Sequence, residues 1–354
     1  MKIRAFVLPC ILVAWLLSVT QIAAGGRGKP RGAQGHISRG LMLYAKGNLN
    51  GAIAEYREAI RKAPEDFDAH NDLGVALNAK GEIEDAIREY GEAVSLEPGN
   101  AVVHNNLGTA YEGKGDRAGA AKEFREAIRL NPDLSEAHHN LGRVLLQQGD
   151  ANAAVAEFRQ AIRLKPEWAA AHYNFGRALC LQADWDGALA RFRRAVDLAP
   201  GSAEAHSGLA FALGETGDTE QAITEYREAI KLNPGFLEAH LNVSAFLARK
   251  GDLEGGISEI RQVLRLRPDL SEAHFNLGIL LGRKRQRNDA IACMREAIRL
   301  KPDYALAYHA LADMLRSNGD LQGALEGYRK ALQFDPEMAE ASADYKSLLK
   351  ELNN

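Results

Sequence analysis

Two residue types with useful chemistry recur at a fixed interval along this chain. Histidine stands every 34 residues, at His36, His70, His104, His138, His172, His206, His240 and His274. Asparagine stands two positions after five of these histidines, at Asn106, Asn140, Asn174, Asn242 and Asn276. An imidazole can bind zinc or exchange a proton near neutral pH. A side-chain amide can both donate to and accept from a peptide backbone.

The histidine column is not expected to bind a metal ion. Zinc requires ligand nitrogens about 2.0 to 2.1 Å away, whereas packed helices lie roughly 8 to 10 Å apart. We therefore predict that each ring fills a core position, and we expect no metal site and no cofactor. If the rings are buried and neutral, their pKa values lie below about 6.5. The stability that they allow would then decline as the pH falls below that value.

The elements that position these columns follow the same interval. Nine of the eleven prolines are also 34 residues apart, at Pro64, Pro98, Pro132, Pro166, Pro200, Pro234, Pro268, Pro302 and Pro336. Between Ser135 and Trp168, small and apolar residues form two helical stripes. Gly149 is typical of a helix end and Asp150 of a helix start. The pattern predicts a helical hairpin, which must stack on its neighbours to complete a core.

This pattern resembles the tetratricopeptide repeat (TPR) family. The family signature reads here as His138, Leu141, Gly142, Leu145, Ala154, Phe158, Ala161 and Pro166. The resemblance implies an all-α fold, a right-handed α-solenoid (superhelix) of TPR hairpins with a C-terminal capping helix. One consistent departure is histidine where the family often has tryptophan. The nine repeats are expected at residues 33–66, 67–100, 101–134, 135–168, 169–202, 203–236, 237–270, 271–304 and 305–338, with the capping helix at 339–354.

The chain before the repeats is different in kind. Lys2 and Arg4 precede an apolar run, and small residues follow it at Ala23 and Ala24. This order is typical of a secretory signal peptide. We therefore expect an exported protein, either in the bacterial periplasm or secreted. The run is also nearly long enough to stay as an N-terminal membrane anchor, which would hold the protein at the inner membrane. Residues 1–24 are assigned to this signal peptide or anchor, and residues 25–32 to a flexible basic linker.

The asparagine column suggests where a ligand binds. The resemblance implies that the first helix of each hairpin lines the concave side of the superhelix. The column is similar to the asparagine ladder in the TPR region of O-linked N-acetylglucosamine transferase, where the side chains hold peptide backbone. We therefore predict a peptide-binding groove at Asn106, Asn140, Asn174, Asn242 and Asn276. Arg143 and Arg177, one helical turn further along, are candidate partners for a carboxylate. The alternative is that these amides and guanidinium groups have no ligand.

Composition and motifs restrict the function. The net charge of -3 and the interspersed charges lack the basic stripe that binds nucleic acid. The chain has no P-loop, no Rossmann glycine pattern and no nucleophile elbow. We predict a non-enzymatic protein-protein interaction scaffold that binds a peptide or protein. A membrane-tethered envelope assembly factor remains an alternative, with residues 5–24 as its membrane contact. An accessory subunit of a glycosyltransferase-type enzyme also remains open.

The seventh and eighth repeats are expected to be less stable than their neighbours. Gly255 and Gly256 fall inside the second helix of repeat seven, and each glycine costs a helix about 1 kcal/mol relative to alanine. Arg285 stands where other repeats have a turn glycine. We predict a locally soft region from about residue 250 to 290, with fast backbone hydrogen exchange.

Overall fold

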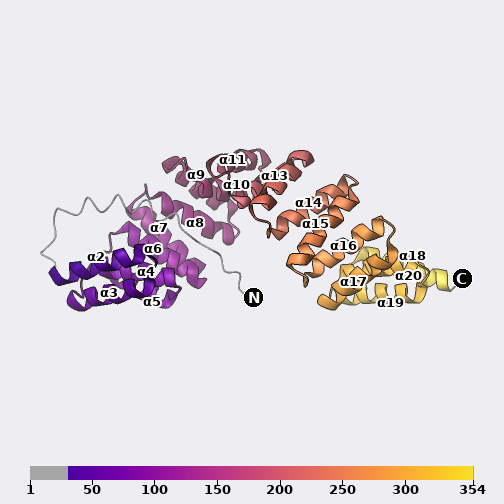
Figure 1. Cartoon of the computed structure of the whole chain (residues 1–354), viewed down its shortest axis with the longest axis horizontal. Coiled ribbons are helices and arrows are strands. Elements are labelled where there is room, and N and C mark those ends of the chain that lie inside the picture. The colour runs from indigo at the N-terminus through magenta and orange to yellow at the C-terminus, as the bar shows by residue number, and fades with distance from the viewer. Residues whose placement is uncertain (1–30, 354) are drawn as a thin grey trace. The chain divides into compact units, whose positions relative to one another are not determined.

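The computed structural model describes residues 31–353, whose regular structure consists of nineteen α-helices with no strand. The chain divides into two compact units, Met1–Gln148 and Gly149–Asn354, and each is described by itself (Figure 1). The segment expected to be a signal peptide or anchor lies outside the described residues. The first described helix begins at Arg31, so the last two residues of the expected linker are helical. None of the described helices has both the length and the apolar character needed to cross a membrane.

Unit 1 contains three complete hairpins and the first helix of repeat four (Figure 1). The hairpins are α2–α3, α4–α5 and α6–α7, which correspond to repeats one to three. The helices are α2 (Arg31–Ala45), α3 (Leu49–Lys62), α4 (Phe67–Lys80), α5 (Ile83–Leu96), α6 (Ala101–Lys114), α7 (Arg117–Leu130) and α8 (Ser135–Gln147).

Unit 2 begins with the second helix of repeat four and continues through five hairpins, α10–α11 to α18–α19 (Figure 1). A final helix, α20, follows where the sequence predicts the cap. The helices are α9 (Ala151–Leu164), α10 (Ala169–Leu181), α11 (Trp185–Leu198), α12 (Ala203–Glu215), α13 (Thr219–Leu232), α14 (Leu237–Arg249), α15 (Leu253–Leu266), α16 (Ser271–Arg283), α17 (Arg287–Leu300), α18 (Ala305–Ser317), α19 (Leu321–Phe334) and α20 (Ala339–Leu352).

Short signals between the two helices of each hairpin fix the turn. Gly81 has a φ of 88° and ends α4 in the left-handed conformation, which glycine adopts without strain. In the next repeat, Asp116 accepts a hydrogen bond from the backbone N–H of Gly119 at 2.9 Å and so caps α7. Two turns keep the left-handed conformation without glycine, at Ala183 (φ 55°) and Arg285 (φ 62°).

A glycine on the first helix allows an aromatic ring of the second helix to pack against its backbone. A Cβ built on Gly74 would lie 2.7 Å from the ring of Tyr90, and one on Gly108 would lie 2.7 Å from the ring of Phe124. Both rings are fully buried. A larger residue at either glycine would displace the ring, at a cost of about 1 to 3 kcal/mol.

Repeat seven differs from the other repeats at the small residues where its two helices meet. Ser244 replaces the usual glycine on α14, and Gly256 replaces the usual alanine on α15. The Ser244 hydroxyl donates to the Gly256 carbonyl at 2.9 Å, and a Cβ on Gly256 would lie only 3.1 Å from the Ser244 carbonyl oxygen. Gly256 therefore allows α15 to lie close to the backbone of α14 at Ser244. Glycine still destabilises the helix relative to alanine. Fast backbone hydrogen exchange in this region therefore stays a prediction.

The first helices of neighbouring repeats approach one another. In unit 1, α2 contacts α4, α4 contacts α6, and α6 contacts α8. In unit 2, α10 contacts α12 and α16 contacts α18. No two second helices of neighbouring repeats within the described units have contacts of comparable extent. We call the surface formed by the first helices of each unit the first-helix face.

Candidate peptide-binding face

Asparagine side chains form an inter-repeat ladder on the first-helix face of unit 1. The Nδ2 of Asn106 donates to Oδ1 of Asn71 at 3.1 Å, and the Nδ2 of Asn140 donates to Oδ1 of Asn105 at 3.0 Å. Each bond joins residues 35 positions apart. One partner stands directly after the histidine of its repeat, and the other stands two positions after the histidine of the following repeat. Asn106 and Asn140 were predicted from the sequence, but their partners Asn71 and Asn105 were not, although the 35-residue separation is visible there.

Both predicted residues of this ladder keep hydrogen-bonding capacity. Asn106 and Asn140 are half-buried. Each uses one N–H in the ladder, and its Oδ1 accepts no hydrogen bond from the described part of the chain. An amide has two N–H donors and a carbonyl acceptor. Each side chain can therefore still donate to and accept from an extended peptide.

The two predicted arginines have partners within the protein. Arg143 forms an ion pair with Glu112 of the preceding repeat, whose side chain is 14% exposed. Its charge is therefore partly balanced before any ligand arrives. Arg177 is exposed, donates to Oδ1 of Asn174 at 3.4 Å, and lies 5.8 Å from the ring centre of Tyr173. Of the two arginines, Arg177 is the more available to a carboxylate.

The predicted column does not continue as one ladder through unit 2. Gly208 takes the asparagine position in repeat six, and a Cβ there would lie 2.6 Å from the ring of Phe192. The buried ring thus leaves no room for an amide. In the next repeat, Nδ2 of Asn242 donates to the hydroxyl of Tyr226 at 2.9 Å. Asn276 is half-buried and makes no hydrogen bond with the described residues.

Several histidines of the column contact a glutamate through one ring nitrogen and a proline carbonyl through the other, and we call this pair of contacts the clamp. In repeat two, His70 Nδ1 lies 2.7 Å from Oε2 of Glu89, and Nε2 lies 2.8 Å from the carbonyl oxygen of Pro64. Because both partners are acceptors, a ring that donates to both carries two protons and a positive charge. The condition of a buried neutral ring is not met here, because the Glu89 carboxylate and the Pro64 carbonyl raise the pKa of His70 against the effect of burial.

The glutamate recurs 19 residues after most of the histidines. The same Nδ1 contacts, at 2.6 to 2.7 Å, are His36–Glu55, His104–Glu123, His206–Glu225 and His240–Glu259. Contacts of Nε2 with a proline carbonyl are made by His104, His138, His172, His206, His240 and His274. The clamp therefore ties together the end of one repeat and both helices of the next.

Repeat five lacks the acidic partner. Arg191 stands 19 residues after His172, where six of the eight histidine repeats have glutamate and repeat eight has Cys293. The guanidinium of Arg191 lies 5.2 Å from the ring centre of Phe175. The Nε2 of His172 donates to Pro166 at 2.9 Å, whereas its buried Nδ1 has no hydrogen-bond partner in the described chain. Burial, together with Arg191 and Arg194, lowers the pKa of His172. The direction of this shift is the one expected for a buried neutral ring.

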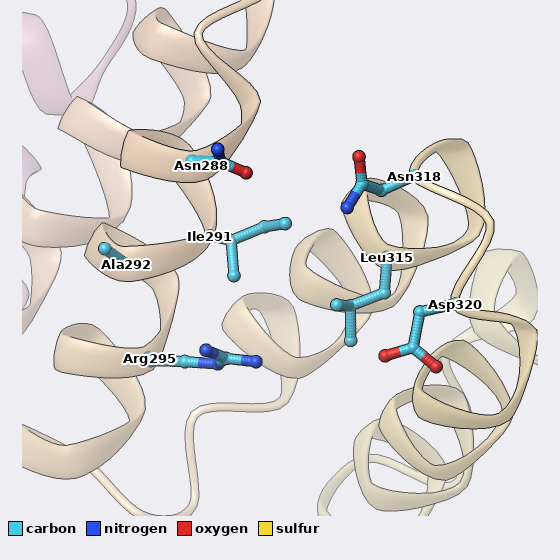
Figure 2. A pocket seen from close by; sticks show the side chains of 7 residues that line it. All are labelled: Asn288, Ile291, Ala292, Arg295, Leu315, Asn318 and Asp320. Carbon is cyan, nitrogen blue, oxygen red and sulfur yellow. The ribbon is translucent and has the colours of Figure 1, made fainter.

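One further hollow lies between α17 and the turn from α18 to α19, with a cavity volume of about 360 Å³. Figure 2 shows its polar lining, in which the side chains of Arg295 and Asn288 face Asn318 and Asp320. None of the predicted groove residues lines it. The two thiols in the described part of the chain are unsuited to nucleophilic chemistry, because burial raises the pKa of Cys180 to about 11 and raises that of Cys293.

These features define an α-solenoid of helical hairpins with an amide-lined first-helix face. Models of the TPR repeat family match residues 40–81 and 76–115, and models of the tetratricopeptide repeat family match residues 105–169, 139–203, 179–240 and 275–339. The chain belongs to the tetratricopeptide repeat family. Proteins of this family are generally protein-interaction scaffolds.

Solved structures agree with the fold. The pilF protein of Pseudomonas aeruginosa is 24% identical, with a TM-score of 0.56 over 63% of this chain and 100% of its own. A tetratricopeptide repeat protein from Parabacteroides merdae is 15% identical, with a TM-score of 0.55 over 71% of this chain and 100% of its own. No curated protein matches the chain.

Proposed function

We propose that this protein is a non-enzymatic scaffold that binds an extended segment of another protein along the first-helix face. The observation that carries the proposal is the amide ladder of unit 1. There, Asn106 and Asn140 are fixed by Asn71 and Asn105 and still have a carbonyl oxygen without a partner in the described chain. A side chain already held in place loses little conformational freedom on binding.

The ladder supports a ligand that is recognised through its backbone. Amides pair with any peptide unit, so they supply affinity without reading a sequence. Sequence preference would come from neighbouring side chains. The pairing of Arg143 with Glu112 argues against a strongly acidic ligand in unit 1, because the arginine would first have to leave its own carboxylate. In unit 2, Arg177 provides a separate site for a carboxylate, while Asn174, Asn242 and Asn276 belong to an interrupted row.

Photo-crosslinking in the native host tests this proposal. A photoreactive residue at Thr109, half-buried and one helical turn beyond Asn106, samples the face without removing the ladder. We expect a dominant protein adduct, lost in the variant Asn106→Ala with Asn140→Ala. A probe at Arg129, exposed on the second helix α7, is the control. Adducts from Arg129 with none from Thr109 would place the binding surface elsewhere.

A matched variant separates ligand contact from stability. Asn71→Ala removes the same inter-repeat bond as Asn106→Ala but leaves the Asn106 amide in place. If the amide contacts the ligand directly, the adduct survives in Asn71→Ala. Equal loss in both variants would mean that the ladder only stabilises the repeats.

We also propose export across a membrane, on the sequence of residues 1–24 alone. Mass spectrometry of the protein from its host distinguishes cleavage near Ala24 from a retained anchor. A full-length mass in the membrane fraction would favour the membrane-tethered assembly factor, and a full-length mass in the cytosol would contradict export.

A further inference from the structure

A histidine and two aspartates meet where the last repeat joins the C-terminal helix. His309 and Asp313 are four residues apart on α18, and Asp344 lies on α20. The Nε2 of His309 is 2.9 Å from Oδ2 of Asp344 and 4.0 Å from Oδ1 of Asp313. One ligand atom from each side chain lies within 4.8 Å of the others. Residues four apart share one helix face, so the helix presents the first two side chains together.

A buried hydroxyl orients one of the carboxylates. The hydroxyl of Tyr328, whose residue is 1% exposed, donates to Oδ1 of Asp313 at 2.6 Å. The ring of Tyr328 also packs beside that of His309, with centres 5.6 Å apart. Side chains that ligate metals are typically held by such outer hydrogen bonds, which restrict their direction. The Tyr328 hydroxyl therefore restricts the direction of the Asp313 carboxylate.

The corresponding residue pairs in unit 1 are uncharged, although Asn71 also donates to the buried carboxylate of Asp72 at 3.2 Å. There the same 35-residue register is filled by the pairs Asn71–Asn106 and Asn105–Asn140. An amide pair is thus enough to bridge neighbouring repeats. The last junction instead places two carboxylates beside an imidazole, an arrangement that stacking does not require.

We propose that His309, Asp313 and Asp344 bind one divalent transition-metal ion, with zinc as the reference ion. The two carboxylates and a neutral imidazole balance the charge of the ion. Ligand atoms around tetrahedral zinc are about 3.3 Å apart for bonds of about 2.0 Å. The observed separations of 2.9 and 4.0 Å lie on either side of this value. Small rotations of the side chains would complete the set.

The exposure of the carboxylates leaves room for further ligands. The side chains of Asp313 and Asp344 are 51% and 38% exposed, whereas that of His309 is 13% exposed. Water, or a side chain from a bound protein, can fill the remaining positions. The expectation of no metal site was based on the histidine column, and His309 lies one position outside that column, after Tyr308.

The ion would fasten the terminal helix to the stack. Helix α20 buries only Ala341 and Leu348 completely. Its other ionic link to α18 is the pair Arg316–Glu351 at 2.7 Å. The core contacts of α20 are made with α19 and include Leu348 and Tyr345, so a bond through the metal ion would add a direct link between α20 and α18. The site would then make the end of the stack dependent on metal.

Zinc titration of the full-length, chelator-treated protein tests the proposal. Calorimetry and native mass spectrometry should find one ion per chain at this site. His309→Gln and Asp344→Asn should each abolish that binding event, and Tyr328→Phe should weaken it by roughly tenfold. His274→Gln, which alters a histidine remote in sequence from the cluster, should leave it unchanged. Asp344→Asn restores the uncharged type of junction seen in unit 1, so the fold is expected to persist.

Hydrogen exchange supplies a second readout. At a free zinc concentration ten times the dissociation constant, opening of α20 should be suppressed by roughly tenfold. The suppression should be absent in Asp344→Asn. Zinc affinity that is unchanged in both ligand variants would overturn the proposal. So would zinc binding that leaves the exchange of α20 unchanged.

Discussion

Repeats two and five place a histidine in the same slot and surround it with opposite chemistry. In repeat two, Glu89 and the Pro64 carbonyl face both nitrogens of His70, and they raise its pKa. In repeat five, Arg191 replaces the glutamate, and one nitrogen of His172 is buried without a partner in the described chain. Burial then lowers the pKa of His172. The pKa of the histidine is therefore shifted in opposite directions in these two repeats, and the residue 19 positions later differs between them.

This difference gives the two repeats opposite dependence on pH. His70 has a folded pKa above the unfolded value, so its stabilising contribution is complete below about 6.5 and is lost as the pH rises through the folded pKa. His172 has a folded pKa below the unfolded value, so its contribution is complete above about 6.5 and declines as the pH falls. The array is consequently not uniformly sensitive to acid.

Removing the ring should cost a clamped repeat more than repeat five. His104→Ala removes the 2.7 Å partner of Glu123, a residue 8% exposed that keeps an ion pair with Lys122 at 3.7 Å, and losing a hydrogen bond to a charged group costs about 1.5 to 3 kcal/mol. His172→Ala creates a similar space but leaves no carboxylate without its hydrogen bond. We therefore expect a loss of stability of about 1 kcal/mol. Long repeat arrays do not unfold as one unit. The losses should therefore be measured by hydrogen exchange in α6–α7 and α10–α11. Equal losses would contradict the clamp.

Restoring the acid should convert repeat five into a clamped repeat. Arg191→Glu places a carboxylate 19 residues after His172, and a hydrogen bond to a charged group contributes about 1.5 kcal/mol or more. The new glutamate should raise the pKa of His172, so the gain should be present at pH 6 and smaller at pH 8. Arg191→Gln removes the same cation without adding an acid. If both variants behave alike, the effect comes from the lost arginine.

The titration of individual rings tests the comparison without a measurement of stability. Nuclear magnetic resonance of labelled histidines should place the midpoint of His70 above that of His172, on opposite sides of about 6.5. Glu89→Gln removes the charged acceptor, so the midpoint of His70 should move down. If the titration midpoint of His70 does not change in this variant, Glu89 is not the cause of its raised pKa.

Much of the fold follows from local signals in the sequence. The 34-residue interval, the small residues on both helices and the Gly-Asp turns predict each hairpin, because each signal acts within a few residues of its position. Gly74 beside Tyr90 is an example of the packing that they imply. The two-unit division is different, because it depends on the sum of contacts along the chain rather than on any one motif.

The site was predicted less completely, since its geometry depends on pairs one repeat apart. The asparagine column identified Asn106 and Asn140, but their bonds to Asn71 and Asn105 become apparent only when neighbouring helices are placed side by side. Gly208 interrupts the column because the ring of Phe192 fills the space, and that ring comes from the preceding repeat. The recurring glutamate was visible as a spacing of 19, yet on a helix surface such a residue is ordinarily solvated.

The smallest expected effect concerns the turns, where repeat eight differs from repeat seven. Gly251 has a φ of 89°, and Arg285 holds a φ of 62° at the corresponding turn. A left-handed conformation costs a residue with a side chain about 1 to 2 kcal/mol. Replacing it with glycine removes this strain, but glycine also loses more conformational entropy on folding, which offsets part of the stabilisation. Arg285→Gly should therefore stabilise α16–α17 by about 0.5 kcal/mol. The reverse change, Gly251→Ala, should destabilise α14–α15 by about 1 kcal/mol. Hydrogen exchange of the two hairpins measures both changes, and faster exchange of α16–α17 in Arg285→Gly would show that the arginine makes a contact worth more than the strain.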